Sequence, residues 1–167
     1  VGCNHQGNID TALKMIEIAS KVCKVDVLKF QKRNPIELLS EDQYNEKHES
    51  PQNSFGKNYG EHREFLEFNM EQHATIKKVC EDNGIMYSCS VWDMTSAKNI
   101  IELNPEIIKI PSACNTNWQL LDYTCKNFNG EIHLSLGMTT HEEEAEIMEL
   151  FKSTNRTKDL VVYSCTS

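Results

Sequence analysis

Apolar residues recur along the chain with two different periods. Short apolar runs, typical of buried strands, alternate with longer stretches in which apolar residues return every three or four positions, as on one face of a helix. We predict strands at residues 25–31, 85–90, 106–110, 131–136 and 160–163. Before the first strand and between the others we predict helices, at residues 9–23, 70–82, 93–103, 117–128 and 140–151. This alternation is typical of a parallel sheet covered by helices.

The segment at about 32–69 interrupts the alternation. It is rich in Asn, Pro, Ser, Gly and charged residues and follows neither period. A stretch of this length without a period is unusual inside a compact domain and is typical of a functional or flexible loop. We predict a long loop, part of which docks on the fold through its aromatic residues Phe55, Tyr59, Phe65 and Phe68.

Two architectures fit the alternation, an open doubly wound sheet and a (β/α)8 barrel. The phosphate loops GxGxxG and GxxxxGK[ST], which favour the first, do not occur in the sequence. Polar residues instead recur where the predicted strands end, as on the active face of a barrel. Counting a strand stub at residues 1–3, we predict about six of the eight parallel strands of a closed barrel. The predicted fold class is α/β, a (β/α)8 TIM barrel present as a partial barrel, with residues 1–167 as one domain and no second domain.

The composition and net charge of the chain exclude some classes of binding partner. The net charge of −8 and the pI near 5.2 argue against a nucleic-acid partner, which selects for a basic face. No apolar run is long enough to predict a membrane span, and no basic-then-apolar leader that would predict a signal peptide occurs in the sequence. The seven cysteines are scattered without a CxxC pair, as in a reduced, cytoplasmic protein. Both ends are expected to be cut, because Val1 replaces Met and Ser167 follows an apolar run.

Two lysines lie within predicted apolar strands. Side chains alternate along a strand, so Lys29 and Gln31 share one face of their strand. Lys29 alone either extends to water or meets an anion. If Lys109 points into the same cavity, a ligand with two or three negative charges would relieve the repulsion between the two ammonium groups. Serines at neighbouring strand ends would add hydrogen bonds to phosphate oxygens; these are Ser90, Ser112 and Ser167.

Five segments resemble motifs of the N-acetylneuraminate (sialic acid) synthases, in the same order and at similar spacing. They are Asn4-His5-Gln6-Gly7 (NHNG), Leu28-Lys29-Phe30-Gln31 (VKFQ), Ile108-Lys109-Ile110-Pro111-Ser112 (KIxS), Leu134-Ser135-Leu136-Gly137-Met138 (LSTGM) and Tyr163-Ser164-Cys165-Thr166-Ser167 (LHCTS). The legionaminic and pseudaminic acid synthases share these motifs. The resemblance implies a TIM-barrel catalytic domain that condenses phosphoenolpyruvate with an N-acetylated amino sugar, such as N-acetylmannosamine, and water. The products would be a nonulosonic acid and phosphate.

The resemblance also implies roles for individual residues. Lys29 and Lys109 would hold the phosphate and carboxylate of phosphoenolpyruvate, and Gln31 would face the sugar. Asn53 would match a loop asparagine that touches the acceptor. The phosphate would accept hydrogen bonds from Ser90, Ser112 and Ser167. The chain departs from the family pattern at residues 89–93, where many members have STPFD, and at Ser164, where they have His.

Other parts of the family's machinery have no counterpart here. In the family a catalytic Glu lies just ahead of the position of Val1, and the metal-binding histidines and a sugar-binding Asp follow the sixth strand. The divalent metal (Mn or Mg) is therefore expected to have no ligand in this chain. His5 is expected to order its turn, His62 and His73 to lie in a solvated region, and His141 to lie in the first turn of a helix. His133 would share a strand face with Ser135.

Three functional readings remain open from the sequence. The first is a sialic acid synthase, a homodimer when full length, of which this fragment alone would be inactive. The second is a phosphoenolpyruvate-condensing barrel of the 3-deoxy sugar acid phosphate synthase type. The third is a truncated, non-catalytic barrel fragment, whose incomplete parallel sheet would leave open edges.

Overall fold

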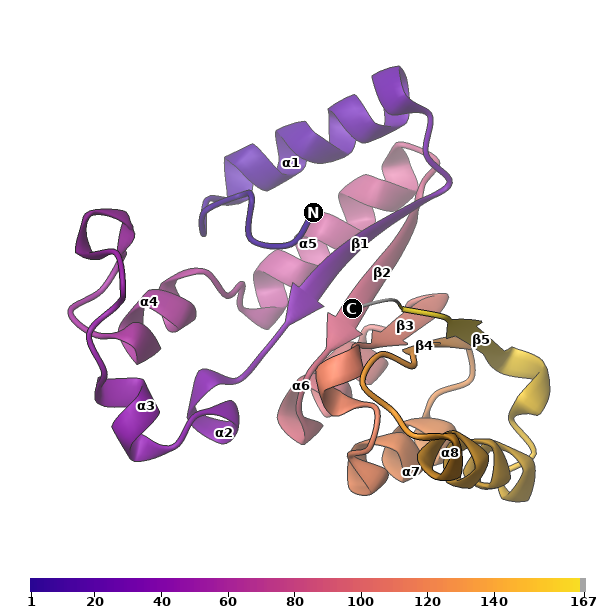
Figure 1. The fold of residues 1–167 in the computed structure, drawn as a ribbon. Helices are drawn as coiled ribbons and strands as arrows, with labels where there is room; N and C mark the ends of the chain where they lie inside the picture. The colour runs from indigo at the N-terminus through magenta and orange to yellow at the C-terminus, as the bar shows by residue number, and fades with distance from the viewer. Residues whose placement is uncertain (166–167) are drawn as a thin grey trace.

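Five parallel strands form the centre of the molecule in a computed structural model that describes residues 1–165 (Figure 1). They are β1 (Val27–Lys32), β2 (Met86–Val91), β3 (Ile107–Ile110), β4 (Glu131–Ser135) and β5 (Leu160–Tyr163). Their spatial order is the same as their order in the sequence, and each neighbouring pair is parallel. A doubly wound sheet reverses its strand order at a switch point, whereas a barrel does not. The topology is therefore that of a partial barrel.

Helices alternate with the strands as the sequence predicts. They are α1 (Ile9–Ile18), which continues as a π-helical turn over Ala19–Cys23, α5 (Met70–Asp82), α6 (Met94–Glu102), α7 (Trp118–Asn127) and α8 (His141–Ser153). Each begins after a residue whose side-chain oxygen accepts a backbone N–H of the first turn; these caps are Asn8, Asn69, Asp93, Asn117 and Thr140. Figure 1 shows α1 and α5 side by side next to β1 and β2, and α7 and α8 beside the other half of the sheet. None of the helices in residues 1–165 combines the length and apolar character that crossing a membrane requires.

The hydrophobic core lies between the helices and one face of the sheet. Alternate strand residues point into it, and they include Phe30, Tyr87, Cys89, Ile108, Ile110, Ile132 and Leu134, all at most 1% exposed. The helices contribute Ile16, Ile76, Ile100, Leu120, Leu121, Ile147 and Phe151, which are buried to the same degree. The residues between them in the strands therefore point to the opposite face of the sheet, which in a barrel is the inside.

The expected strand stub at the start of the chain is wrong. Residues 2–7 form turns, with positive φ angles at Gly2, Gln6 and Gly7. Val1 nevertheless lies against β1, because its backbone nitrogen donates a hydrogen bond to the Lys29 carbonyl at 2.9 Å. One such bond does not make a strand ladder, so the part of the chain that the structure describes has five strands rather than about six.

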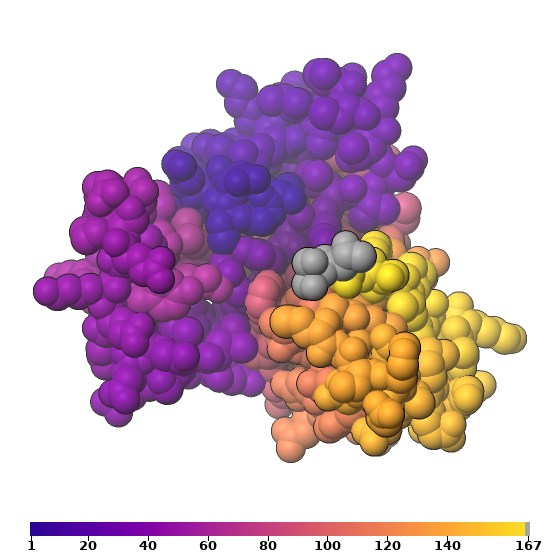
Figure 2. Space-filling model, viewed as in Figure 1, coloured from indigo at the N-terminus to yellow at the C-terminus, as the bar shows by residue number. Residues whose placement is uncertain are grey.

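The 32–69 segment is not an irregular loop throughout. It contains α2 (Pro35–Leu38), α3 (Glu41–Asn45), a 3-10 turn over Pro51–Asn53 and α4 (Tyr59–Phe65). Figure 2 shows this segment, coloured purple to magenta, as a projection from one side of the molecule. Phe68 docks it, because this side chain is 3% exposed and stacks on His5 at a centroid distance of 4.1 Å. Phe55 and Phe65 stack on each other at 4.8 Å and remain exposed.

Candidate functional site

Polar side chains line the face of the sheet that the helices do not cover. We call this set the polar face; it comprises Lys29, Gln31, Ser88, Ser90, Lys109, His133, Ser135 and Tyr163. Strand register makes its members neighbours, because Lys29 pairs with Ser88, Gln31 with Ser90, Ser90 with Lys109, Lys109 with His133, and Ser135 with Tyr163. Residues on the same face of paired strands lie within contact distance. The sheet thus brings together Lys29, Gln31, Ser90 and Lys109, which we identified in three different predicted strands.

The two lysines of the polar face have no acidic partner among the residues that the structure describes. Neither Lys29 nor Lys109 forms an ion pair within residues 1–165. Burial lowers the pKa of both ammonium groups, and the charge of Lys29 lowers the pKa of Lys109 further. The two side chains are therefore close enough to repel each other. An anion bound between them would remove this repulsion, whereas a cation would increase it.

Ser112 is held at the end of β3 by the loop that follows β4. Its hydroxyl oxygen accepts a hydrogen bond from the Gly137 N–H at 3.2 Å. A Cβ atom on Gly137 would lie 2.6 Å from Ser112 Oγ, so a larger residue there would displace the Ser112 hydroxyl. The buried Asn115 joins the same two loops by donating to the carbonyls of Ser135 and Gly137 at 3.0 and 2.9 Å. Ser112 is thus fixed beside the polar face.

Cys165 marks the place where the chain returns to this site after β5. Hydrogen bonding with Ser135 and Ser112, together with the charge of Lys109, lowers the pKa of its thiol. The thiol therefore lies among three groups from β3, β4 and the β3 loop. Ser167, the remaining serine of the predicted set, lies outside the described residues.

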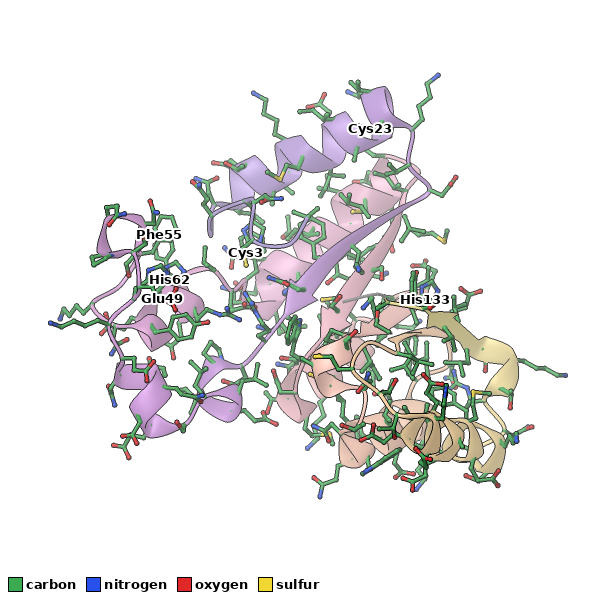
Figure 3. All side chains as sticks on the ribbon, in the orientation of Figure 1. Cys3, Cys23, Glu49, Phe55, His62 and His133 are labelled. Atoms are coloured by element: carbon green, nitrogen blue, oxygen red, sulfur yellow. The ribbon has the colours of Figure 1, made fainter. Side chains whose placement is uncertain are left out.

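Gln31 lies on β1, at the edge of the polar face that is farthest from β5, and its side chain is anchored there. Its amide nitrogen donates to the sulfur of Cys3 at 2.8 Å, and Cys3 (labelled in Figure 3) also accepts from Arg33 at 3.0 Å. Arg33 in turn forms an ion pair with Glu67 at 2.6 Å, and both side chains are less than a tenth exposed. The turn at the start of the chain and the 32–69 segment therefore fix the orientation of Gln31.

Asn53 is the one described candidate that the structure does not bring to the polar face. It is exposed, and both its backbone N–H and its side-chain amide bond to Ser50. Figure 1 shows that the segment joining α3 and α4, which contains Asn53, lies away from β3, β4 and β5.

Some residues of the polar face escaped the sequence reasoning. The Ser88 hydroxyl is buried and has no hydrogen-bond partner among residues 1–165. Tyr163 donates towards His133, whose Nδ1 lies 2.8 Å from the phenol oxygen. The position of Ser88, two residues before Ser90, was the available signal for this serine, because strand residues two apart share a face.

The histidines mostly occupy the expected environments. His5 orders its turn by accepting the Gly7 N–H at 3.1 Å, and His141 lies in the first turn of α8. His62 stacks on Phe55 at 5.7 Å in the projecting segment. The expectation for His73 is wrong, because its side chain is completely buried beneath the helix-covered face of the sheet.

The residues present do not fit a divalent metal ion. Residues 1–165 contain no group of three or more His, Cys, Asp or Glu side chains arranged to bind one. The polar face offers mainly ammonium and hydroxyl groups, and the positive charge of the lysines disfavours a cation there. Its chemistry suits an anion that carries a phosphate or carboxylate group.

Comparison with known proteins agrees with this reading. The family model described as the NeuB family matches residues 15–167. The human N-acetylneuraminate-9-phosphate synthase is 31% identical over all of this chain and 45% of its own length. The N,N'-diacetyllegionaminic acid synthase of Campylobacter jejuni is 26% identical over 99% of this chain and 49% of its own length.

A solved structure shows the same fold. It is the N-acetylneuraminic acid synthetase of Leptospira borgpetersenii in complex with citrate, which is 24% identical and superposes with a TM-score of 0.80. The match covers 99% of this chain and 52% of that one. The chain spans about half the length of the relatives that it matches. The prediction of a partial (β/α)8 barrel is thus confirmed, and the chain belongs to the NeuB family.

Proposed function

We propose that the protein containing this chain condenses phosphoenolpyruvate with an N-acetylated amino sugar and water, and that this chain binds the phosphoenolpyruvate. The observation that carries the proposal is a pair of lysines, without acidic partners among residues 1–165, on a sheet face lined by serines. Phosphoenolpyruvate has a carboxylate and a phosphate group, so its charge complements two ammonium groups. Carbon 3 of phosphoenolpyruvate would form a bond to the sugar aldehyde, water would add at carbon 2, and phosphate would leave.

Each residue of the site would contribute binding or orientation. Lys29 and Lys109 would pair with the phosphate and carboxylate groups, which holds the reactive enol in one orientation. The hydroxyls of Ser90, Ser112 and Ser167 would donate to phosphate oxygens. Gln31 would face the sugar. We leave Asn53 out of this set, because the structure does not bring it to the polar face.

The remaining groups of the reaction are proposed to lie outside this chain. They are the proton-transferring Glu and the ligands of a divalent metal, Mn or Mg, which would act on the sugar aldehyde as a Lewis acid. We assign the metal no ligand among residues 1–165, because no fitting donor set occurs there. We therefore propose that residues 1–167 alone do not catalyse the reaction.

In this proposal the acceptor is an N-acetylated hexosamine. An experiment has to establish whether the acceptor carries a phosphate group at C6. One relative is named for a product phosphorylated at C9 and another for a legionaminic acid without that phosphate. The condensation adds three carbons to a hexosamine, so a C9 phosphate must come from an acceptor phosphorylated at C6. N-acetylmannosamine and its 6-phosphate therefore distinguish the two cases.

The test is phosphate release by the full-length protein with phosphoenolpyruvate, a divalent metal and each acceptor in turn. We expect release with at least one acceptor, and about a 100-fold lower kcat/KM for phosphoenolpyruvate in Lys29→Ala and in Lys109→Ala, because each loses a charge-assisted contact. Lys78→Ala, at an exposed position of α5, is the matched control and should leave the rate unchanged.

Two results would count against the proposal. One is the absence of phosphate release with every N-acetylated hexosamine. The other is consumption of erythrose 4-phosphate or arabinose 5-phosphate instead, which would favour a 3-deoxy sugar acid phosphate synthase.

The proposal includes an assembly state and a location. We propose a homodimer of the full-length protein, which light scattering would test. We also propose a cytoplasmic location; the cysteines support it, because all seven are free thiols.

A further inference from the structure

Three residues of the last two strands form a hydrogen-bonded chain beside Lys109. We propose that Tyr163 is a positioning residue that holds the Lys109 ammonium group for phosphoenolpyruvate, and that His133 and Glu131 fix the Tyr163 ring. This inference rests on the proposed function for the role of Lys109. It adds a contact that neither the motifs nor the comparisons assign.

The geometry defines the direction of the hydrogen bonds. His133 (labelled in Figure 3) lies on β4 next to β5, and its Nε2 is 3.1 Å from a carboxylate oxygen of Glu131. A carboxylate only accepts, so Nε2 carries the hydrogen and Nδ1 accepts in a neutral imidazole. The Tyr163 hydroxyl, 2.8 Å from Nδ1, therefore donates to it. The phenol ring is held at its polar end.

The held ring presents its face to Lys109. The Lys109 nitrogen lies 5.7 Å from the centre of the Tyr163 ring, within the range of a cation–π contact. Lys109 also pairs in register with His133, so the three side chains share the polar face. Tyr163 lies on β5, which pairs with β4, but it is 30 positions from His133 in the sequence. Only the pairing of the two strands brings these side chains together.

A ring is a suitable partner for a lysine that must bind an anion. A carboxylate would neutralise the ammonium charge and occupy its hydrogens, whereas an aromatic face attracts the charge and leaves the N–H groups free. The titratable groups that act on Lys109 are Lys29, Cys114 and Cys165; the Lys29 ammonium opposes the charged form of Lys109, whereas the two cysteines would favour it as thiolates. The Tyr163 ring offsets part of this repulsion while the site awaits phosphoenolpyruvate.

The test compares variants of the full-length protein by steady-state kinetics and by calorimetric binding of phosphoenolpyruvate. Tyr163→Leu should raise KM for phosphoenolpyruvate about fivefold, the size of one cation–π contact, and leave kcat and the acceptor KM within about twofold. Binding of phosphoenolpyruvate should weaken at high pH as Lys109 loses its proton; we call this part of the pH profile the alkaline limb. In Tyr163→Leu the alkaline limb should lie about 0.7 pH unit lower than in the wild-type protein, because the ring favours the ammonium form of Lys109.

Further variants separate the ring from its support. Tyr163→Phe and His133→Leu each remove the hydrogen bond, and each should raise KM for phosphoenolpyruvate about twofold. The double variant should be no worse than either single one, because both changes break the same contact. The matched control is Tyr123→Leu on α7, which removes a similar contact with Lys98 at 5.8 Å on the helix side and should leave phosphoenolpyruvate binding unchanged.

The outcomes distinguish this inference from the proposed function. If the wild-type protein binds phosphoenolpyruvate but releases no phosphate, the proposed reaction fails, and the role of Tyr163 stands if Tyr163→Leu weakens binding about fivefold. Unchanged phosphoenolpyruvate affinity in Tyr163→Leu overturns the inference. So does an equal loss for both substrates without a shift of the alkaline limb, since that pattern indicates a structural role only. If the wild-type protein binds no phosphoenolpyruvate, both the function and the inference fail.

Discussion

His73 should make the stability of this protein depend on pH. Its side chain is completely buried, and Nδ1 lies 2.8 Å from the Tyr87 hydroxyl. Its Nε2 has no partner among residues 1–165. Burial, together with smaller contributions from Lys32 and His5, lowers the pKa of His73 from 6.5 to about 3. The folded protein therefore holds the neutral imidazole, while an unfolded chain takes up a proton below about pH 6.5.

The size of the effect follows from the two pKa values. The unfolded state binds more protons between pH 6.5 and about 3, so stability falls as the pH falls through this range. At pH 5 the loss relative to pH 7.5 is about 2 kcal/mol, and the full difference of pKa corresponds to about 5 kcal/mol at still lower pH.

The assay is urea denaturation of the wild-type protein and His73→Gln at several pH values from 7.5 to 5. Gln cannot be protonated, and its amide oxygen can accept the Tyr87 hydrogen bond. The stability of the variant relative to wild type should rise by about 2 kcal/mol as the pH is lowered, while all other titrating groups cancel. Parallel stability curves for the two proteins would refute the reasoning.

Two arginines, Arg33, which is buried, and Arg156, which is partly buried, give further predictions for stability, measured by urea denaturation. Glu67→Gln leaves the buried guanidinium of Arg33 without its carboxylate and should cost about 3–5 kcal/mol; the exposed Glu71→Gln should cost less than about 0.5 kcal/mol, and equal losses would contradict the role of burial. Arg156→Ala should cost about 3 kcal/mol, because it leaves backbone carbonyls without a donor. The guanidinium donates to the carbonyls of Cys125, Phe128 and Gly130. Lys152→Ala, at an exposed position, is the control, and a similar loss there would exclude this explanation.

The strands and the two lysines were predictable because their signals are local. Lys29 precedes Phe30 and Lys109 lies between Ile108 and Ile110, so the alternation of a strand alone places the lysines opposite the core. The positions of the helices likewise follow from apolar spacing and caps. In the 32–69 segment the spacing Ser40-x-x-Gln43 was a usable capping signal for α3, and the structure forms that capping box.

The remaining features depend on packing that no local pattern contains. The charges around His73 suggested solvent, yet His73 shares the buried face of α5 with Ile76 and Cys80. That spacing was the overlooked signal, since residues three and four apart lie on one side of a helix. The contact of Tyr163 with His133 depends on the register in which β4 pairs with β5. The sequence predicts that these two strands are neighbours, but it does not predict their register.

For the engineering of this protein, Gly137 and Ser112 have to be treated together. Gly137 does not have a positive φ, so its backbone would accept other residues. What opposes them is space, because a methyl group there would lie 2.6 Å from Ser112 Oγ and 3.3 Å from Cβ of Cys165. A loop grafted after β4 from a related barrel would therefore leave the Ser112 hydroxyl in its present position only if it kept the glycine.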